Sequence, residues 1–169
     1  MKFKKIGEEA YVDTCRSLGT EAPDEQLREE WQSIPLPIRT SYGSAGYDFT
    51  MPYDVELKAG ESVIICTGIA FESERKDVCL MILPRSSVGI KYGLKFLNTI
   101  PLIDVDNVQG FRDNQILLYT TVDKDCALRK GQKFAQAVIL PYFTTDDDRV
   151  VIKEDKSLFK EQGFEPWKR

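Results

Sequence analysis

From Gly43 to Pro141 the sequence consists of short runs of β-branched and aromatic residues separated by turn residues. Runs of this length and composition predict β-strands. The turns Lys58–Glu61 and Arg129–Gln132 each contain a glycine and precede a hydrophobic run. Because no helical 3.6-residue periodicity alternates with these runs, an all-β barrel or jelly roll is favoured over a parallel α/β architecture. The predicted strands are Tyr47–Met51, Val55–Leu57, Ser62–Phe71, Val78–Pro84, Leu94–Asn98, Gln115–Val122 and Lys133–Pro141.

The first 33 residues differ from this pattern and predict two helices. Pro23 and the acidic residues after it favour a helix from about Ala22 to Gln32. An imperfect apolar stripe predicts an earlier helix from about Gly7 to Leu18. Two prolines at positions 35 and 37 then end helical structure, because proline disfavours helical geometry in the residue before it. We therefore divide the chain into an N-terminal helical extension (1–35), a β-barrel body (36–143) and a charged tail (144–169).

The composition excludes several kinds of catalysis. The chain contains no histidine, so a Ser-His-Asp triad, a Cys-His pair and His-ligated zinc are ruled out. A general base must then be a carboxylate, a lysine, a tyrosine or a thiolate. The cysteines are widely separated and form no C-x-x-C pair, so we expect buried, reduced thiols at Cys15, Cys66, Cys79 and Cys126.

Charge and hydropathy limit the possible partners. A formal charge of -4 and a pI near 5.0 argue against nucleic acid as the main partner, because that affinity is built on net positive surface. No stretch approaches the roughly 20 apolar residues that span a bilayer, and the N-terminus lacks the apolar segment of a signal peptide. We expect a cytoplasmic protein with no membrane partner. Binding of a small anionic ligand remains compatible with this charge if basic side chains converge locally.

One segment has the composition of a phosphate cradle. Pro84-Arg85-Ser86-Ser87-Val88-Gly89 follows a strongly apolar strand. An arginine fork, two hydroxyl groups and the N–H groups of a starting helical turn would together bind a phosphate there. A serine-capped turn with a solvated arginine is the alternative.

Three further segments place polar groups beside apolar runs. Small residues precede Asp48, and Asn98 stands six residues ahead of Asp104. Because Leu-Ile precedes Asp104, we expect partial desolvation of its carboxylate, the condition that tunes an acid toward base catalysis. A strand-end acid that caps a turn is the alternative. Gln136 lies within another strand, where a buried amide must find a partner.

Taken in order, these segments resemble the signatures of the trimeric dUTPase (dUTP diphosphatase) family, which run along the lines of AGYD, PRSS, N-x-x-G-x-I-D and G-x-x-x-A-Q. The resemblance covers about residues 36–142. The longer form Pro84–Tyr92 and the N-terminal helices resemble a bacterial or phage subgroup. The matching segments are Ala45–Asp48, Pro84–Ser87, Asn98–Asp104 and Gly131–Gln136.

The resemblance implies a distorted jelly-roll β-barrel in a homotrimer, with each active site at a subunit boundary. It implies hydrolysis of dUTP to dUMP and pyrophosphate, in which Asp104 activates a water that attacks the α-phosphate. Arg85 would organise this region with Asp48 as its ion-pair partner. Mg²⁺ would be held mainly through the triphosphate and waters, with no protein metal ligand assigned. The implied substrate contacts are Ser86, Ser87, Gly89 and Gln136 to the phosphates, and Asn98 and the Ile103 backbone to uracil.

The chain departs from the family pattern in two places. In the third motif Asn107 stands where the family has a sugar-stacking tyrosine, and Phe111 could supply the missing ring if the loop folds back. Pro101 replaces a glycine and removes a backbone donor. The Gly-rich arm at the C-terminus is degenerate, although Phe164 could still cap the base.

Two alternatives stay open. The departures favour the first, a dUTPase-like nucleotide-binding or regulatory protein with weak or no catalysis. A dCTP deaminase-type enzyme is less favoured, because Gln115–Val122 contains no carboxylate for the glutamate of that reaction.

Overall fold

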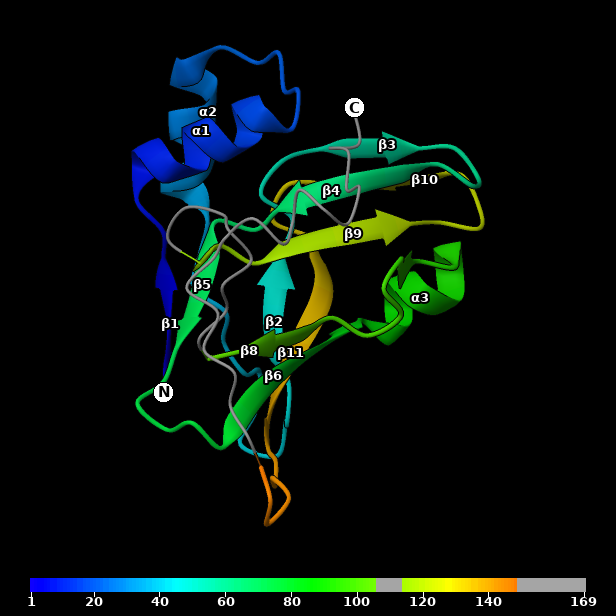
Figure 1. Ribbon diagram of the computed structural model, residues 1–169. Coiled ribbons are helices and arrows are strands. Elements are labelled where there is room, and N and C mark those ends of the chain that lie inside the picture. Colours follow the sequence, from blue (N-terminus) through cyan, green and yellow to red (C-terminus); the bar gives the residue numbers. More distant parts are fainter. Residues whose placement is uncertain (106–113, 149–169) are drawn as a thin grey trace.

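The computed structural model describes residues 1–105 and 114–148, and it is built mainly from antiparallel strands (Figure 1). Short apolar runs between turns form strands because alternate side chains can be buried in a shared core. The elements are β1 (Lys2–Lys5), α1 (Glu8–Ser17), α2 (Asp24–Ser33), β2 (Tyr47–Thr50), β3 (Val55–Leu57), β4 (Ser62–Cys66), β5 (Ile69–Glu72), β6 (Val78–Pro84), α3 (Ser86–Tyr92), β7 (Lys95–Phe96), β8 (Leu102–Asp104), β9 (Leu117–Thr121), β10 (Cys126–Leu128) and β11 (Lys133–Pro141).

A four-stranded antiparallel sheet in the order β2-β11-β6-β8 carries most of the candidate site. Its inward face is apolar and fully buried at Leu80, Ile82 and Ala137. Strand alternation places the intervening residues on the opposite, outward face, where they form three cross-strand rows. The first row is Asp48–Gln136–Leu83, the second is Val138–Met81–Leu102, and the third is Leu140–Cys79–Asp104.

A second sheet, β4-β9-β7, and the pair β3-β10 lie over the inward face of the first sheet (Figure 1). Their inward residues, such as Ile65, Leu118 and Leu128, belong to the same hydrophobic core as Leu80 and Ile82. Two packed layers around one core are the expected solution for strands that each have one apolar face. The predicted all-β class is therefore confirmed.

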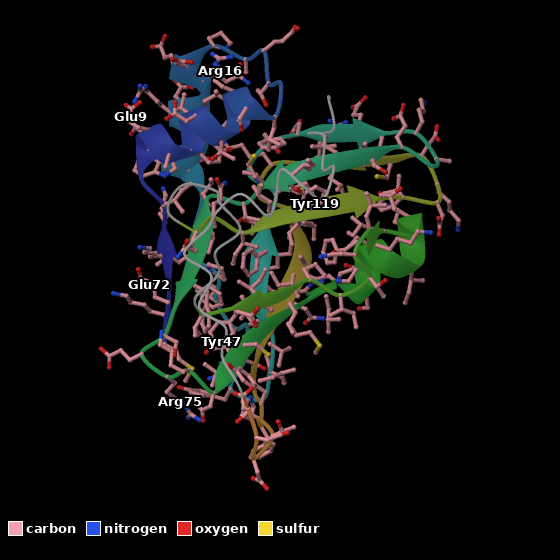
Figure 2. All side chains as sticks on the ribbon, viewed as in Figure 1. Glu9, Arg16, Tyr47, Glu72, Arg75 and Tyr119 are labelled. Atoms are coloured by element: carbon pink, nitrogen blue, oxygen red, sulfur yellow. The ribbon has the colours of Figure 1, made fainter. Side chains whose placement is uncertain are left out.

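The N-terminal segment shares this core. β1 pairs with β5, and the ring of Phe3 lies 5.2 Å from that of Tyr47 and 5.6 Å from that of Phe71. The inward side of α1 is buried, whereas its charged residues Glu9 and Arg16 project outward (Figure 2). A strand of the body thus precedes the two helices. The division at residue 35 remains a prediction.

Several predicted elements match and others differ. Both helices and the strands β6 and β11 form where the sequence predicts them. The run Ser62–Phe71 divides into β4 and β5, because Gly68 adopts a left-handed φ of 69°. The short strands β1, β8 and β10 were not predicted. All four cysteines are buried as expected, and none is in a disulfide.

The helices of the described residues are too short or too polar to span a bilayer.

Candidate phosphate and catalytic site

A buried carboxylate with two cationic partners is the centre of the site. Asp48 in β2 is 5% exposed. Its Oδ1 accepts a hydrogen bond from Nη1 of Arg85, and its Oδ2 lies 2.9 Å from Nζ of Lys133. The sequence predicted the partnership with Arg85 but not the one with Lys133.

Lys133 reaches Asp48 because β11 contains a bulge. Lys133 pairs with Thr50 and Ala135 with Phe49, so Phe134 is an extra residue in the register. Residues three apart on a regular strand point to opposite faces, but a bulge changes this alternation. Lys133 and Gln136 therefore both lie on the Asp48 side of the sheet, while Phe134 is fully buried.

The two cations decide the ionisation of Asp48. Burial alone would raise the pKa of its carboxyl group, but the close ion pair with Lys133, and the hydrogen bond and charge of Arg85, hold the pKa below its ordinary value. Asp48 is therefore a carboxylate throughout the neutral range.

Arg85 stands where β6 ends and α3 begins. Its backbone N–H donates to the Phe134 carbonyl at 2.9 Å, and its own carbonyl accepts from Val88 and Gly89. Ser86 and Ser87 follow it and are exposed. The first N–H groups of a helix have no intrahelical partner, so they are open to a ligand beside the guanidinium. The ion pair with a buried carboxylate excludes a fully solvated Arg85.

Gln136 is held against Gly46 of the first motif. Asp48 and Gln136 are direct cross-strand partners. A Cβ at Gly46 would lie only 2.6 Å from Oε1 of Gln136, so glycine is required for this approach. The structure thus brings Asp48, Arg85, Lys133 and Gln136 together at one end of the sheet.

Asp104 lies elsewhere on the same outward face. Strand alternation buries Ile103 at 3% exposure and turns Leu102 and Asp104 outward, so within one chain Asp104 is exposed. The expected desolvation by its aliphatic neighbours is wrong for the isolated chain, because those neighbours do not cover its face. Asp104 pairs with Cys79; burial, and secondarily the Asp104 charge, raise the pKa of that thiol.

A single chain does not bring Asp104 and Arg85 together. Cys79, the partner of Asp104, precedes Arg85 by six residues along β6. At about 3.3 Å per residue this separates them by roughly 20 Å. A site that uses both residues must draw them from two chains.

Asn98 lies in the loop that connects β7 of one sheet to β8 of the other, and it is exposed. The next residue, Thr99, has a left-handed φ of 66°, and the Asn98 carbonyl accepts the Ile100 N–H at 2.7 Å. Left-handed geometry is strained for a β-branched residue. Pro101 lacks an N–H, but its carbonyl accepts the Ile82 N–H at 2.9 Å and so continues the ladder with β6.

Other predicted positions are outside the described residues. These are Asn107, Phe111 and Phe164.

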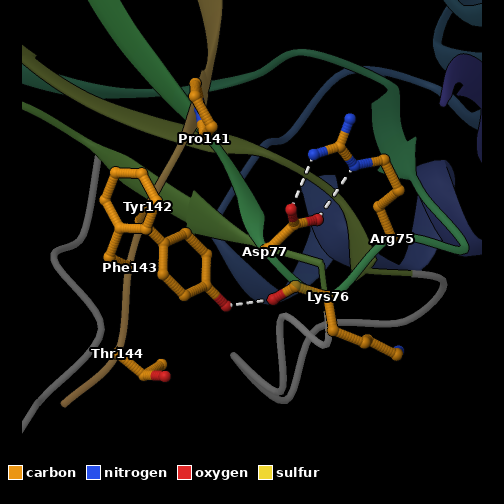
Figure 3. Close-up of a pocket in the computed structure, with 7 residues that line it drawn as sticks. All are labelled: Arg75, Lys76, Asp77, Pro141, Tyr142, Phe143 and Thr144. Carbon is orange, nitrogen blue, oxygen red and sulfur yellow. Dashed lines mark hydrogen bonds and ion pairs between the residues drawn. The ribbon is translucent and has the colours of Figure 1, made fainter. Parts of the chain in front are cut away.

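An open cavity of about 790 Å³ lies at the opposite end of β6 and β11 from Arg85 (Figure 3). Arg75 forms an ion pair with Asp77 at 2.6 Å there, and the Tyr142 hydroxyl donates to the Lys76 carbonyl. None of the predicted site residues is among those that line it, which are Arg75, Lys76, Asp77, Pro141, Tyr142, Phe143 and Thr144.

Comparisons with known proteins identify relatives of this chain. The deoxyuridine 5'-triphosphate nucleotidohydrolase of Acinetobacter baylyi is 33% identical over 129 residues, which cover 75% of this chain and 82% of the relative. The enzyme of that name from Pectobacterium carotovorum is 36% identical over 112 residues, covering 65% and 72%.

Solved structures show the same fold. The dUTPase from Streptococcus mutans matches with a TM-score of 0.63 at 24% identity, over 86% of this chain and 99% of that one. The dUTPase from phage phi11 of S. aureus matches with a TM-score of 0.55 at 20% identity, over 73% and 92%. A family model described as dUTPase matches residues 32–165. The chain therefore belongs to the dUTPase family.

Proposed function

We propose that this protein hydrolyses dUTP to dUMP and pyrophosphate. The observation that carries the proposal is the cluster of Arg85, Gln136 and the start of α3 around the buried Asp48. A fixed guanidinium, a carboxamide and helix N–H groups are the donors that phosphate oxygens accept. Membership of the dUTPase family and the names of the relatives support dUTP as the substrate.

In this proposal Asp104 is the general base. Its carboxylate takes a proton from a water whose oxygen attacks the α-phosphorus, and the bond from that phosphorus to the bridging oxygen breaks, so that pyrophosphate leaves. Arg85, Ser86, Ser87 and Gln136 bind the phosphate groups and stabilise the charge that develops on them. Gly89 has no donor left for a phosphate, because its N–H donates to the Arg85 carbonyl.

Asn98 is the candidate for reading uracil, because one carboxamide offers both a donor and an acceptor to the pyrimidine edge. Its exposed position in the loop that leads into β8 supports this role. The Ile103 side chain is in the core, so only its backbone could touch the base.

Mg²⁺ is the proposed cofactor, and it would neutralise phosphate charge when bound. One solved phage dUTPase is described with a structural Mg(II) ion. Residues 1–105 and 114–148 contain no group of three or more His, Cys, Asp or Glu side chains placed to hold a metal. Triphosphate oxygens and waters are ligands that suit Mg²⁺, so we assign it to the bound nucleotide.

We also propose a cytoplasmic homotrimer with each site at a subunit boundary. The separation of Asp104 from Arg85 within one chain supports this arrangement. The outward face between them is apolar, with Leu102 at 53% exposure beside the half-buried Met81 and Val138. A neighbouring chain on this face would cover these residues and bring its own site residues to Asp104.

The test is incubation of the purified protein with Mg²⁺ and dUTP, dCTP or dTTP, with pyrophosphate and ammonia followed. Pyrophosphate from dUTP alone is expected. Asp104→Asn should abolish its release while nucleotide affinity stays largely intact, because the amide keeps the shape but cannot accept the proton. Unchanged turnover would remove Asp104 from the mechanism, and ammonia from dCTP would indicate a deaminase.

Nucleotide binding with a regulatory role is the second candidate. The observation that favours it is Pro101, which leaves the residue before β8 without an N–H donor. Structures of a Staphylococcus bacteriophage 80alpha dUTPase, 20% identical to this chain, are described in terms of control of virulence-gene transfer. Tight dUTP binding without turnover would favour this candidate.

A further inference from the structure

Lys133 forms an ion pair with Asp48 in the phosphate site, and the proposed reaction gives it no role. It and Arg85 hold different oxygens of the same carboxylate. The Asp48 side chain is 4% exposed, against 33% for Arg85 and 41% for Lys133. Two partly exposed cations, Arg85 and Lys133, thus contact one buried carboxylate.

A buried carboxylate with a single cationic partner would conflict with phosphate binding. If Arg85 turned its charge toward a triphosphate, Asp48 would be left buried and incompletely paired, which is strongly unfavourable. Two partners remove the conflict. Lys133 retains Oδ2, while Nη1 of Arg85 retains Oδ1. Among the described residues, Nε and Nη2 of Arg85 make no hydrogen bond, so they remain available.

We propose that Lys133 is a positioning residue of the phosphate site: it keeps Asp48 ionised and fixed, so that Arg85 presents its remaining guanidinium N–H groups to the triphosphate. The proposal rests on the proposed function, because it assigns Arg85 to phosphate. The bulge in β11 supports it, since regular alternation would place Lys133 on the face away from Gln136.

The pH dependence of this arrangement follows from the groups that face Asp48. These are Arg85 after β6 and Lys133 in β11, while the segment at Ile38 offers only a carbonyl, which accepts the Asp48 N–H. Loss of Lys133 leaves burial opposed by Arg85 alone, so the pKa of Asp48 rises relative to the wild type. Asp48 then protonates at a higher pH, and Arg85 loses its anchor there.

The experiment measures binding of an imido analogue of dUTP by calorimetry from pH 8 down to pH 3.5, a range that includes the ordinary titration range of an aspartate, with pyrophosphate release from dUTP in parallel. Lys133→Met should bind about tenfold more weakly at neutral pH, the size expected for one hydrogen bond to a charged group. Its affinity should also begin to fall at a higher pH than that of the wild type. Lys133→Arg should restore both properties.

The control is Lys130→Met, which removes an exposed lysine three residues earlier and should change neither property. A double-mutant cycle keeps the test decisive if Lys133→Met is unstable: in an Asp48→Asn background, Lys133→Met should cause little further loss of affinity. An unchanged pH profile in Lys133→Met, or full additivity in the cycle, would overturn the proposal.

The two proposals fail in different ways. If the wild type releases no pyrophosphate from dUTP, the proposed function is wrong. If the wild type turns over dUTP and Lys133→Met matches it at every pH, only the role of Lys133 is wrong.

Discussion

Single residues of the phosphate site are fixed by close approach as much as by charge. A Cβ at Gly46 would lie 3.2 Å from Cβ and 2.6 Å from Oε1 of Gln136. We expect Gly46→Ala to turn the Gln136 carboxamide away and to weaken binding of the imido analogue about tenfold, as for loss of a hydrogen bond to a charged group. The free energy of unfolding should change by less than about 1 kcal/mol, because a flexible side chain can move aside.

Gly43→Ala is the matched control, since a Cβ there would meet nothing within 4 Å. Calorimetry would compare affinities and urea unfolding would compare stabilities. Equal affinity in the two variants would mean that Gln136 does not contact the phosphates.

Side-chain contacts of the site could be predicted from the sequence where the strands alternate regularly. The pairing of Arg85 with Asp48 was expected and is present. Lys133 was missed because a bulge, which leaves no clear mark in the sequence, changes the face to which it points. The predicted desolvation of Asp104 was wrong for a related reason, because its apolar neighbour Ile103 packs on the other face of β8.

Among the elements, the two N-terminal helices and the barrel share one core. Leu27 of α2 is 1% exposed and belongs to the cluster that contains Leu118 of β9. We expect Leu27→Ala to lower the free energy of unfolding by about 2 to 5 kcal/mol, as for other buried leucines. The variant should unfold in a single transition at a lower temperature, because the helices lose their packing together with the barrel.

Circular dichroism at wavelengths that report helix and strand would follow this unfolding, with Glu29→Ala, an exposed position on the same helix, as the control. Two separate transitions would instead support an independent extension at residues 1–35.

Element prediction succeeded where alternation or a long apolar run lies between clear turns. β6 and β11 have many apolar residues between such turns, and their bounds match the prediction, as do those of the short β3, in which a polar residue alternates with two apolar ones. β8 and β10 also have three residues each, but they show no such alternation. β1 is rich in lysine, and it forms a strand because β5 and the ring of Phe3 provide tertiary contacts.

For the whole molecule, the register of one sheet determines what a single chain can do. Asp104 and Arg85 occupy opposite ends of the outward face, on the order of 20 Å apart at the usual rise per residue. The apolar rows between them are only half-buried at Val138, Met81 and Leu140. This sheet is therefore suited to a neighbouring chain, which would complete a site that one chain cannot.

This geometry predicts complementation between two inactive variants. Asp104→Asn lacks the base and Arg85→Ala lacks the phosphate anchor, so each alone should be nearly inactive. In hybrids formed by refolding an equal mixture, a site is intact when one chain gives Asp104 and its neighbour gives Arg85. Random assembly makes this true for about a quarter of the sites, so pyrophosphate release should return to about a quarter of the wild-type rate.

The control is the same mixture without refolding, in which chains do not exchange and activity should stay near that of each variant. Size-exclusion chromatography with light scattering would confirm that the hybrids have the wild-type mass. If refolded mixtures remain inactive although each variant binds its neighbours normally, then Asp104 and Arg85 must act within one chain. The strand register would then have to change by several residues to bring them together, which the continuous pairing of β6 with β8 and β11 opposes.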